Sequence, residues 1–199
     1  MRLVVDCRFV TPSDDDAVSM TTRGLVSALG VVHPLTMLIS DHRQRDVLPP
    51  LPWQLLRAAD DVRDLVTPFG LNEAGVDVLF SPVPVWSTLG RRYGLVVGSA
   101  APTHPDVYSG VGGRMLRPLR PVFHRLLQRG ADAVVAVAGA GQRDAVTATR
   151  PGQAIIRLDP HNVLSPSGSD WSEHTDQLMA LFYEVHRERR SRARSDNQR

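Results

Sequence analysis

The stretch VDVLFSPVPVWSTLGRRYGLVVGSAA (Val76–Ala101) decides the fold. It contains two short apolar runs, Val76–Phe80 and Tyr93–Val97, each closed by a small or kinked pair of residues. Runs this short, rich in Val and Leu and bounded by Pro, Gly or Ser, are typical of strands buried on both faces of a parallel sheet. Ligands of such sheets bind beyond the carboxyl ends of the strands. The loops that follow the two runs are therefore the first place to look for a functional site.

The rest of the chain alternates strand-like and helix-like segments. Further strands are expected at Arg2–Cys7, His33–Ile39, Ala133–Ala138 and Ala154–Leu158. Helices are expected at Val18–Leu29, Trp53–Leu65, Arg114–Arg129 and Ala140–Ala148. This alternation predicts right-handed βαβ units, and hence an α/β fold with a single Rossmann-like parallel sheet covered by helices on both faces.

Details of two helices can be predicted as well. Gly30 is expected to end the first helix, because glycine is common just past a helix. In the helix at 114–129 the expected inner face consists of Met115, Leu119, Val122, Leu126 and Leu127. Pro118 and Pro121 predict a kink or a late start, since proline lacks the N–H that a helix interior needs.

A last helix begins near Asp170, with Glu173 as its capping-box partner. Its apolar stripe, which must pack against the body, consists of Trp171, His174, Leu178, Leu181, Phe182 and Val185. The predicted organisation is thus a Rossmann-like domain at 1–158, a loop and returning helix at 159–190, and a basic disordered tail at 191–199.

Composition limits the class of protein. The chain has 199 residues, of which 42% are hydrophobic and 22% charged, as in a globular domain. It has no apolar run of about 20 residues and no signal-like start, so neither a membrane span nor secretion is expected. The single cysteine, Cys7, excludes an internal disulfide and suits a reducing, cytoplasmic location. Cys7 itself is expected to be a small buried side chain.

The net charge of +2 is concentrated at one end, and every basic residue is Arg. The tail contains Arg187, Arg189, Arg190, Arg192, Arg194 and Arg199. A basic tail can bind nucleic acid or an anionic membrane. A solvated, frayed terminus is the simpler interpretation, and a nucleic-acid partner is not expected.

Several familiar motifs are missing. No G-x-G-x-x-G follows the first strand, and Gly139-Ala140-Gly141 lacks the third glycine. The glycines at 110–113 have no following Lys-Ser or Lys-Thr, and there is no G-x-S-x-G elbow. The seven histidines do not cluster with each other or with Cys7. We therefore expect no bound cofactor, no metal and no hydrolase triad.

A resemblance nevertheless covers about residues 1–150. The blocks that carry it, in order, are MRLVVDCRFV, TTRGLVSAL, HPLTMLISDHRQ, GVDVLFSP, GRRYGLVV and RGADAVVAVA. Together they resemble the N-terminal half of bacterial family-four glycosyltransferases, which have the two-domain GT-B fold. In that family the N-terminal domain holds the acceptor and the C-terminal domain holds the sugar nucleotide.

The donor-binding domain has no counterpart here. Only about fifty residues follow Arg150, too few for a second α/β domain. Yet the sequence from Asn162 resembles the extreme C-terminal helix of such enzymes, which crosses back onto the N-terminal domain. The resemblance thus implies a chain in which the donor domain is deleted between about Pro151 and Asn162.

Two functions remain open at this point. One is an acceptor-binding component, inactive alone, that binds a sugar or glycolipid and works with a donor-binding chain. The other is a non-catalytic interaction or regulatory protein, a homodimer or a partner of a full-length transferase, using the exposed cleft face. Whether any catalysis remains is left open.

The candidate acceptor-binding residues are Asp14, Asp15, Asp16, Ser81, Arg91, Ser99 and His104. Ser81 could bind a ligand hydroxyl or simply cap the turn before proline. Arg91 could bind an anion or be a solvated residue before its strand, and His104 could bind a hydroxyl or be a solvated loop residue. Two family features do not carry over. The loop after the first strand has Asp14–Asp16 instead of glycines, and the positions that often read T-x-H-D in the family are Gly98-Ser99-Ala100-Ala101 here, without the His-Asp pair.

Overall fold

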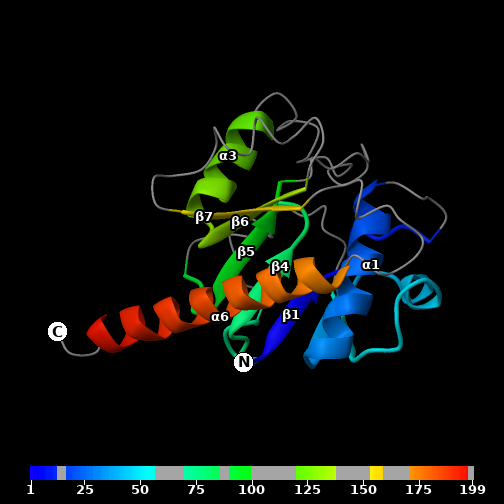
Figure 1. Cartoon of the computed structure of the whole chain (residues 1–199), viewed down its shortest axis with the longest axis horizontal. Coiled ribbons are helices and arrows are strands. Elements are labelled where there is room, and N and C mark those ends of the chain that lie inside the picture. The colour runs from blue at the N-terminus through cyan, green and yellow to red at the C-terminus, as the bar shows by residue number, and fades with distance from the viewer. Residues whose placement is uncertain are drawn as a thin grey trace.

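The structure is a computed structural model that describes residues 1–12, 17–56, 70–85, 90–99, 120–137, 153–158 and 171–196. Within these residues seven parallel strands form one sheet in the order β3-β2-β1-β4-β5-β6-β7 (Figure 1). The strands are β1 (Leu3–Asp6), β2 (Leu35–Ile39), β3 (Trp53–Leu55), β4 (Val78–Ser81), β5 (Gly94–Gly98), β6 (Ala133–Val137) and β7 (Ala154–Leu158). All six predicted strands are confirmed, and the chain has the expected Rossmann-like α/β fold.

The seventh strand corrects a prediction. Trp53–Leu55 was expected to begin a helix, but it pairs with β2 as the edge strand β3. Its flanks join the ladder too, because Met37 N donates to Pro52 O at 2.8 Å and Leu56 N donates to Ile39 O at 2.7 Å. The prolines before it favour extended backbone, and the open edge of β2 offers hydrogen bonds that outweigh a helical spacing of apolar residues.

Helix α1 (Ala17–Val32) confirms the first predicted helix but does not stop at Gly30. Its inner side chains Leu25, Val26 and Leu29 are buried. A Cβ at position 30 would lie 2.6 Å from Leu51 Cδ1, so this glycine serves the close approach of the proline-rich loop. The predicted capping acids Asp14–Asp16 lie outside the described residues.

Helix α3 (Arg120–Gly130) follows β5 and, as a right-handed crossover requires, covers the face opposite α1 (Figure 1). Pro121 lies in its first turn, where a missing N–H is harmless. The predicted inner face is partly wrong: Leu127 is buried, but Val122 and Leu126 are 54% and 56% exposed. The part of this prediction at 114–119 lies outside the described residues.

Helix α6 (Trp171–Asp196) returns across the sheet beside α1, as predicted (Figure 1). Leu178, Leu181, Phe182 and Val185 are buried in the same core as α1. The ring of Phe182 lies 5.9 Å from that of Phe80 on β4. The helix thereby closes one face of the sheet.

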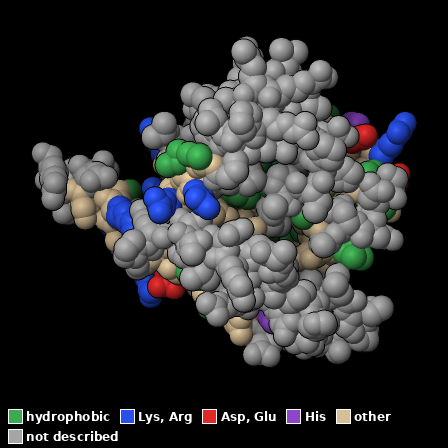
Figure 2. All heavy atoms as spheres, turned by 90° about the horizontal axis from the view of Figure 1, so that it is seen from above, with side chains coloured by type: hydrophobic (Ala, Val, Ile, Leu, Met, Phe, Trp, Pro, Cys, Tyr) green, Lys and Arg blue, Asp and Glu red, His purple; other side chains and the backbone are tan. Residues whose placement is uncertain are grey.

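The predicted disordered tail is wrong as far as Asp196, because α6 continues through it. An ion pair from Arg192 to Glu188 and a hydrogen bond from Ser195 Oγ to Ser191 O, both one helical turn long, support these last turns. Basic side chains gather where this end leaves the body (Figure 2). None of the helices that the structure describes is long and apolar enough to cross a lipid bilayer.

Candidate functional site

The sheet has its topological switch point between β1 and β4, since the strand order runs in opposite directions from there. Asp6 ends β1 and Ser81 ends β4, so both lie at the carboxyl edge of the sheet. The Asp6 carboxylate is completely buried and accepts from Arg8 Nε at 2.9 Å and Arg8 Nη2 at 3.0 Å. Ser81 Oγ lies 3.3 Å from Asp6 Oδ2. A paired carboxylate with a fixed orientation therefore occupies the centre of this edge.

The backbone around this ion pair is held by Gln44, which is 3% exposed. Its Nε2 donates to the carbonyls of Cys7, Arg8 and Val10 at 3.2, 3.1 and 2.7 Å. Its Oε1 accepts from the amides of Ser40 and Asp41, in the capping box of the short helix at His42–Asp46. One side chain thus joins the loops after β1 and β2. Gln44 is not among the residues predicted from sequence, although the D-x-x-Q spacing of Asp41 and Gln44 is typical of a capping box.

Ser81 and Ser99 both lie at this carboxyl edge, as predicted. Ser81 Oγ donates to Val83 O at 2.7 Å, which is the turn-capping role, in addition to its contact with Asp6. Ser99 follows β5, and its amide donates to Val135 O at 2.9 Å, while its Oγ is buried and has no hydrogen-bond partner among the described residues. A Cβ at Gly98 would lie 2.2 Å from Pro82 O, so the loops after β4 and β5 are in direct contact.

The helices that cover one face of the sheet carry two further polar groups without partners among the described residues. Thr22 Oγ1 on α1 and both ring nitrogens of His174 on α6 are buried and make no hydrogen bond in the described structure. The two helices are in contact, and the ring of Tyr183, midway along α6, lies 6.1 Å from the ring of His33, just past the end of α1. Val185 packs on Gly94 at the amino end of β5, and His174 lies eleven residues, about 16 Å, nearer the start of α6, which places it toward the carboxyl edge. His174 lies on the inner stripe, as predicted, but its site role was not foreseen.

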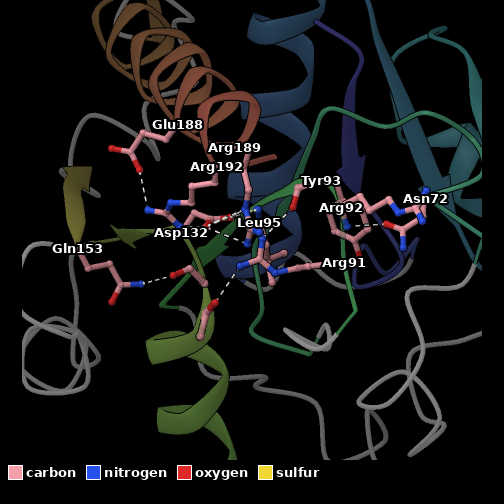
Figure 3. A network of polar contacts seen from close by, with 12 residues as sticks. Asn72, Arg91, Arg92, Tyr93, Leu95, Asp132, Gln153, Glu188, Arg189 and Arg192 are labelled. Atoms are coloured by element: carbon pink, nitrogen blue, oxygen red, sulfur yellow. Dashed lines mark hydrogen bonds and ion pairs between the residues drawn. The ribbon is translucent and has the colours of Figure 1, made fainter. Parts of the chain in front are cut away.

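Arg91 does not belong to this group of residues. It precedes β5 and so lies at the opposite, amino edge of the sheet (Figure 3). Its Nη1 donates to Tyr93 O at 2.8 Å and to the Asp132 carboxylate, and its Nη2 donates to Gly130 O at 2.9 Å. Asp14, Asp15, Asp16 and His104 lie outside the described residues, so their predicted roles stay predictions.

Asp132, just before β6, is the centre of this second cluster. Its carboxylate accepts from Leu95 N at 2.8 Å and from Arg189 Nε at 3.1 Å, in addition to Arg91 (Figure 3). Burial alone would raise the pKa of Asp132, but the hydrogen bond and charge of Arg91, with help from Leu95 and Arg189, hold this pKa below its usual value. The cluster ties α6 to β5 and β6.

Two neighbouring groups are shifted mainly by burial. Burial lowers the pKa of Arg91, and the contacts with Asp132 oppose this shift. Burial raises the pKa of Tyr93 to about 12, and its hydroxyl has no hydrogen-bond partner in the described segments. Neither group is placed to exchange protons near neutral pH, so we interpret the amino-edge cluster as a structural tie.

Metal binding finds no support in the described part of the chain, which contains no group of three or more His, Cys, Asp and Glu side chains able to hold an ion. What the carboxyl edge and the helices that cover it do offer is hydrogen bonding, from the Ser99 and Thr22 hydroxyls and the His174 imidazole. Groups of these types can bind hydroxyls of a ligand.

No family model and no curated protein matches this chain. Among solved structures, one from Corynebacterium glutamicum, assigned as a short-chain dehydrogenase/reductase, aligns with 80% of this chain and 98% of its own. The identity is 10% and the TM-score 0.34. Similarity at this level supports no conclusion about function.

Proposed function

We propose that this protein is the acceptor-binding half of a GT-B-type glycosyl transfer system, related to family-four glycosyltransferases and dependent on another chain for the sugar nucleotide. The observation that carries the proposal is the course of α6. After β7 the chain returns in a single long helix whose Phe182 and Val185 pack on β4 and β5. In the glycosyltransferases that the sequence resembles, a helix of this kind follows a complete donor-binding domain. Here it is the next described element after β7, as expected if that domain is deleted.

The carboxyl edge supports binding of a hydroxyl-rich acceptor. The Asp6 and Arg8 side chains neutralise each other, so this pair does not favour a charged ligand. Within the part of the chain that the structure describes, Ser99, Thr22 and His174 have buried hydrogen-bonding groups without partners. Leaving such groups unpaired costs about 1–3 kcal/mol each, a cost that ligand hydroxyls would remove.

The test is a binding comparison by calorimetry. We expect no heat from UDP- or GDP-sugars, and measurable heat from at least one sugar or glycolipid headgroup in an acceptor panel. His174→Phe should weaken that binding by about tenfold, the value of one hydrogen bond. Tyr183→Phe, on the same helix at the other edge, is the matched control. Tight binding of a sugar nucleotide, or no binding by any acceptor, would overturn the proposal.

A second candidate is the non-catalytic interaction protein. The observation that favours it is the exposed pair Val122 and Leu126, which lie one turn apart on α3. Such a pair suits a protein partner, either a second copy or a transferase chain. Sedimentation would separate the candidates: an association that Val122→Asp with Leu126→Asp abolishes supports this function, and a strict monomer that binds no transferase chain excludes it.

A further inference from the structure

The last turns of α6 carry more positive charge than the fold uses. They project from the body of the protein (Figure 1) and follow Val185, the last buried residue of the helix. The arginines in these turns are Arg187, Arg189, Arg190, Arg192 and Arg194, against two acidic residues, Glu188 and Asp196. The local excess is strongly positive.

The helix sorts these arginines into two sets. Arg189 and Arg192 face the body, where Nη2 of Arg189 lies 3.0 Å and Nη1 of Arg192 lies 3.8 Å from Asp132 Oδ1. The other three, Arg187, Arg190 and Arg194, are exposed and make no ion pair within the described structure. They are three and four residues apart, so they project within about 60° of one another along about 10 Å of helix. We call these three residues the outer arginine stripe.

Like charges on neighbouring turns repel and weaken a helix. The inner arginines offset this cost by anchoring α6 to the sheet, whereas the outer arginine stripe has no such role in the fold. A linear polyanion would neutralise the stripe along its length. We propose that the outer arginine stripe binds the phosphate backbone of nucleic acid without reading its sequence.

The helix surface favours nucleic acid over a membrane. Helices that lie in a membrane interface bury an apolar face between the lipids. From His186 to Asp196 the only apolar side chain is Ala193, so this part of α6 has nothing to insert. Guanidinium contacts to phosphates need no apolar face and dominate non-specific binding to nucleic acid.

The structure supports nucleic-acid binding more strongly than the sequence alone does. A disordered tail would lose conformational entropy on binding, whereas α6 holds the charges in a fixed row through Asp196. The stripe also lies beyond the amino edge of the sheet, away from Ser99 and His174. It is therefore independent of the proposed acceptor site and can be tested separately.

The experiment measures fluorescence anisotropy of a labelled duplex of about 20 base pairs, and of single-stranded RNA, between about 50 and 200 mM KCl. Three phosphate contacts predict a slope of log K against log salt of about −2.7, which is a loss of roughly 40-fold across that range. Arg187→Gln with Arg190→Gln should reduce the slope by about 2 and weaken binding by roughly 50-fold at 0.1 M salt. Arg194→Gln alone should reduce it by about 1.

The matched control is Arg43→Gln with Arg45→Gln, which removes the same charge from exposed residues of the short helix at His42–Asp46. We expect this control to bind like the wild type, and circular dichroism to show the same helix content in every variant. Equal losses in the control and the stripe variant, or binding that does not depend on salt, would overturn the proposal. Tighter binding to phosphatidylserine vesicles than to nucleic acid at the same salt would also overturn it.

Discussion

Gly94→Ala tests whether α6 is seated on the sheet as the structure shows. A Cβ at position 94 would lie 2.4 Å from Val185 Cγ1, whereas ordinary contacts begin near 3.4 Å. Valine is stiff about χ1, so its methyl group cannot simply rotate away. The added methyl group must therefore push α6 from β5 by about 1 Å.

The expected cost follows from two opposing effects. Overpacking a filled core costs about 1–3 kcal/mol. Replacing glycine by alanine restricts the unfolded chain and returns about 0.4–1 kcal/mol. The net loss in the free energy of unfolding should thus be about 1–2 kcal/mol. Val185→Ala alone should cost about 2 kcal/mol, because it removes two buried methyl groups and leaves a small cavity.

Urea denaturation followed by circular dichroism would close the double-mutant cycle. In the double variant the alanine at 94 occupies space vacated by Val185. The loss in its free energy of unfolding should therefore be smaller than the sum of the two single-variant losses by at least about 1 kcal/mol. Val31→Ala is the control, since Val31 is 86% exposed at the end of α1 and should combine additively with Gly94→Ala. An additive cycle at Val185, or a Gly94→Ala variant as stable as the wild type, would refute this position of α6.

The remaining predictions concern the two edges of the sheet. Asp132→Asn should lower the free energy of unfolding by about 3 kcal/mol because it leaves Arg91 buried and unpaired, whereas Glu188→Gln at an exposed pair should change it by less than about 0.5 kcal/mol in the same urea assay. Because folding lowers the pKa of Asp132, its contribution to stability is present above its unfolded pKa of about 3.9 and is lost as pH falls below this value. The difference in free energy of unfolding between wild type and Asp132→Asn should therefore narrow only below about pH 4. A difference that disappears nearer neutral pH would contradict the lowered pKa of Asp132. Gln44→Leu removes three donations to backbone carbonyls and should cost about 2–3 kcal/mol, with faster amide exchange in the loop after β1. Burial, and then the charge of Asp6, raise the pKa of the Cys7 thiol, so a disulfide reagent at pH about 8 should label the native protein only as fast as it unfolds.

The sheet could be predicted from sequence because its strands carry their own signal. Each predicted strand is a short apolar run, and each lies in the sheet; two of them continue one residue past the run, to Ser81 and Gly98. Burial on both faces makes that signal continuous and thus easy to recognise. The returning helix was predictable for the same reason, since its stripe from Leu178 to Val185 has helical spacing.

The errors arose where the environment decides the outcome. Trp53–Leu55 has helical periodicity, but the open edge of β2 makes it a strand. Val122 and Leu126 have the spacing of an inner face, yet they face solvent because α3 is turned so that Leu127 is buried. In the tail, pairs such as Arg192 with Glu188 extend a helix that composition alone predicts to fray. Sequence periodicity reports a possible face and not the neighbour that covers it.

The candidate site was predictable only in part. Ser81 and Ser99 were found because both follow strands, and position along a strand is readable from sequence. Arg91 was misplaced with them because a strand has two ends, and a residue before a strand lies at the opposite edge from one after it. Gln44 and His174 reach their places through long-range packing of α6 and of the loop after β2. That packing leaves little trace in the local pattern.

The two edges of the sheet differ in how their polar groups are used. At the amino edge, the Asp132 carboxylate joins Arg91, Leu95 and Arg189, and this cluster ties α6 to the sheet. At the carboxyl edge and on the helices that cover it, hydroxyl and imidazole groups are buried without hydrogen-bond partners among the described residues. Buried polar groups with partners stabilise the fold, whereas buried polar groups without partners lower its stability. Stability and ligand binding should therefore be separable: His174→Phe should maintain or raise the free energy of unfolding while weakening acceptor binding, and Asp132→Asn should lower stability without changing acceptor affinity in the fraction that remains folded.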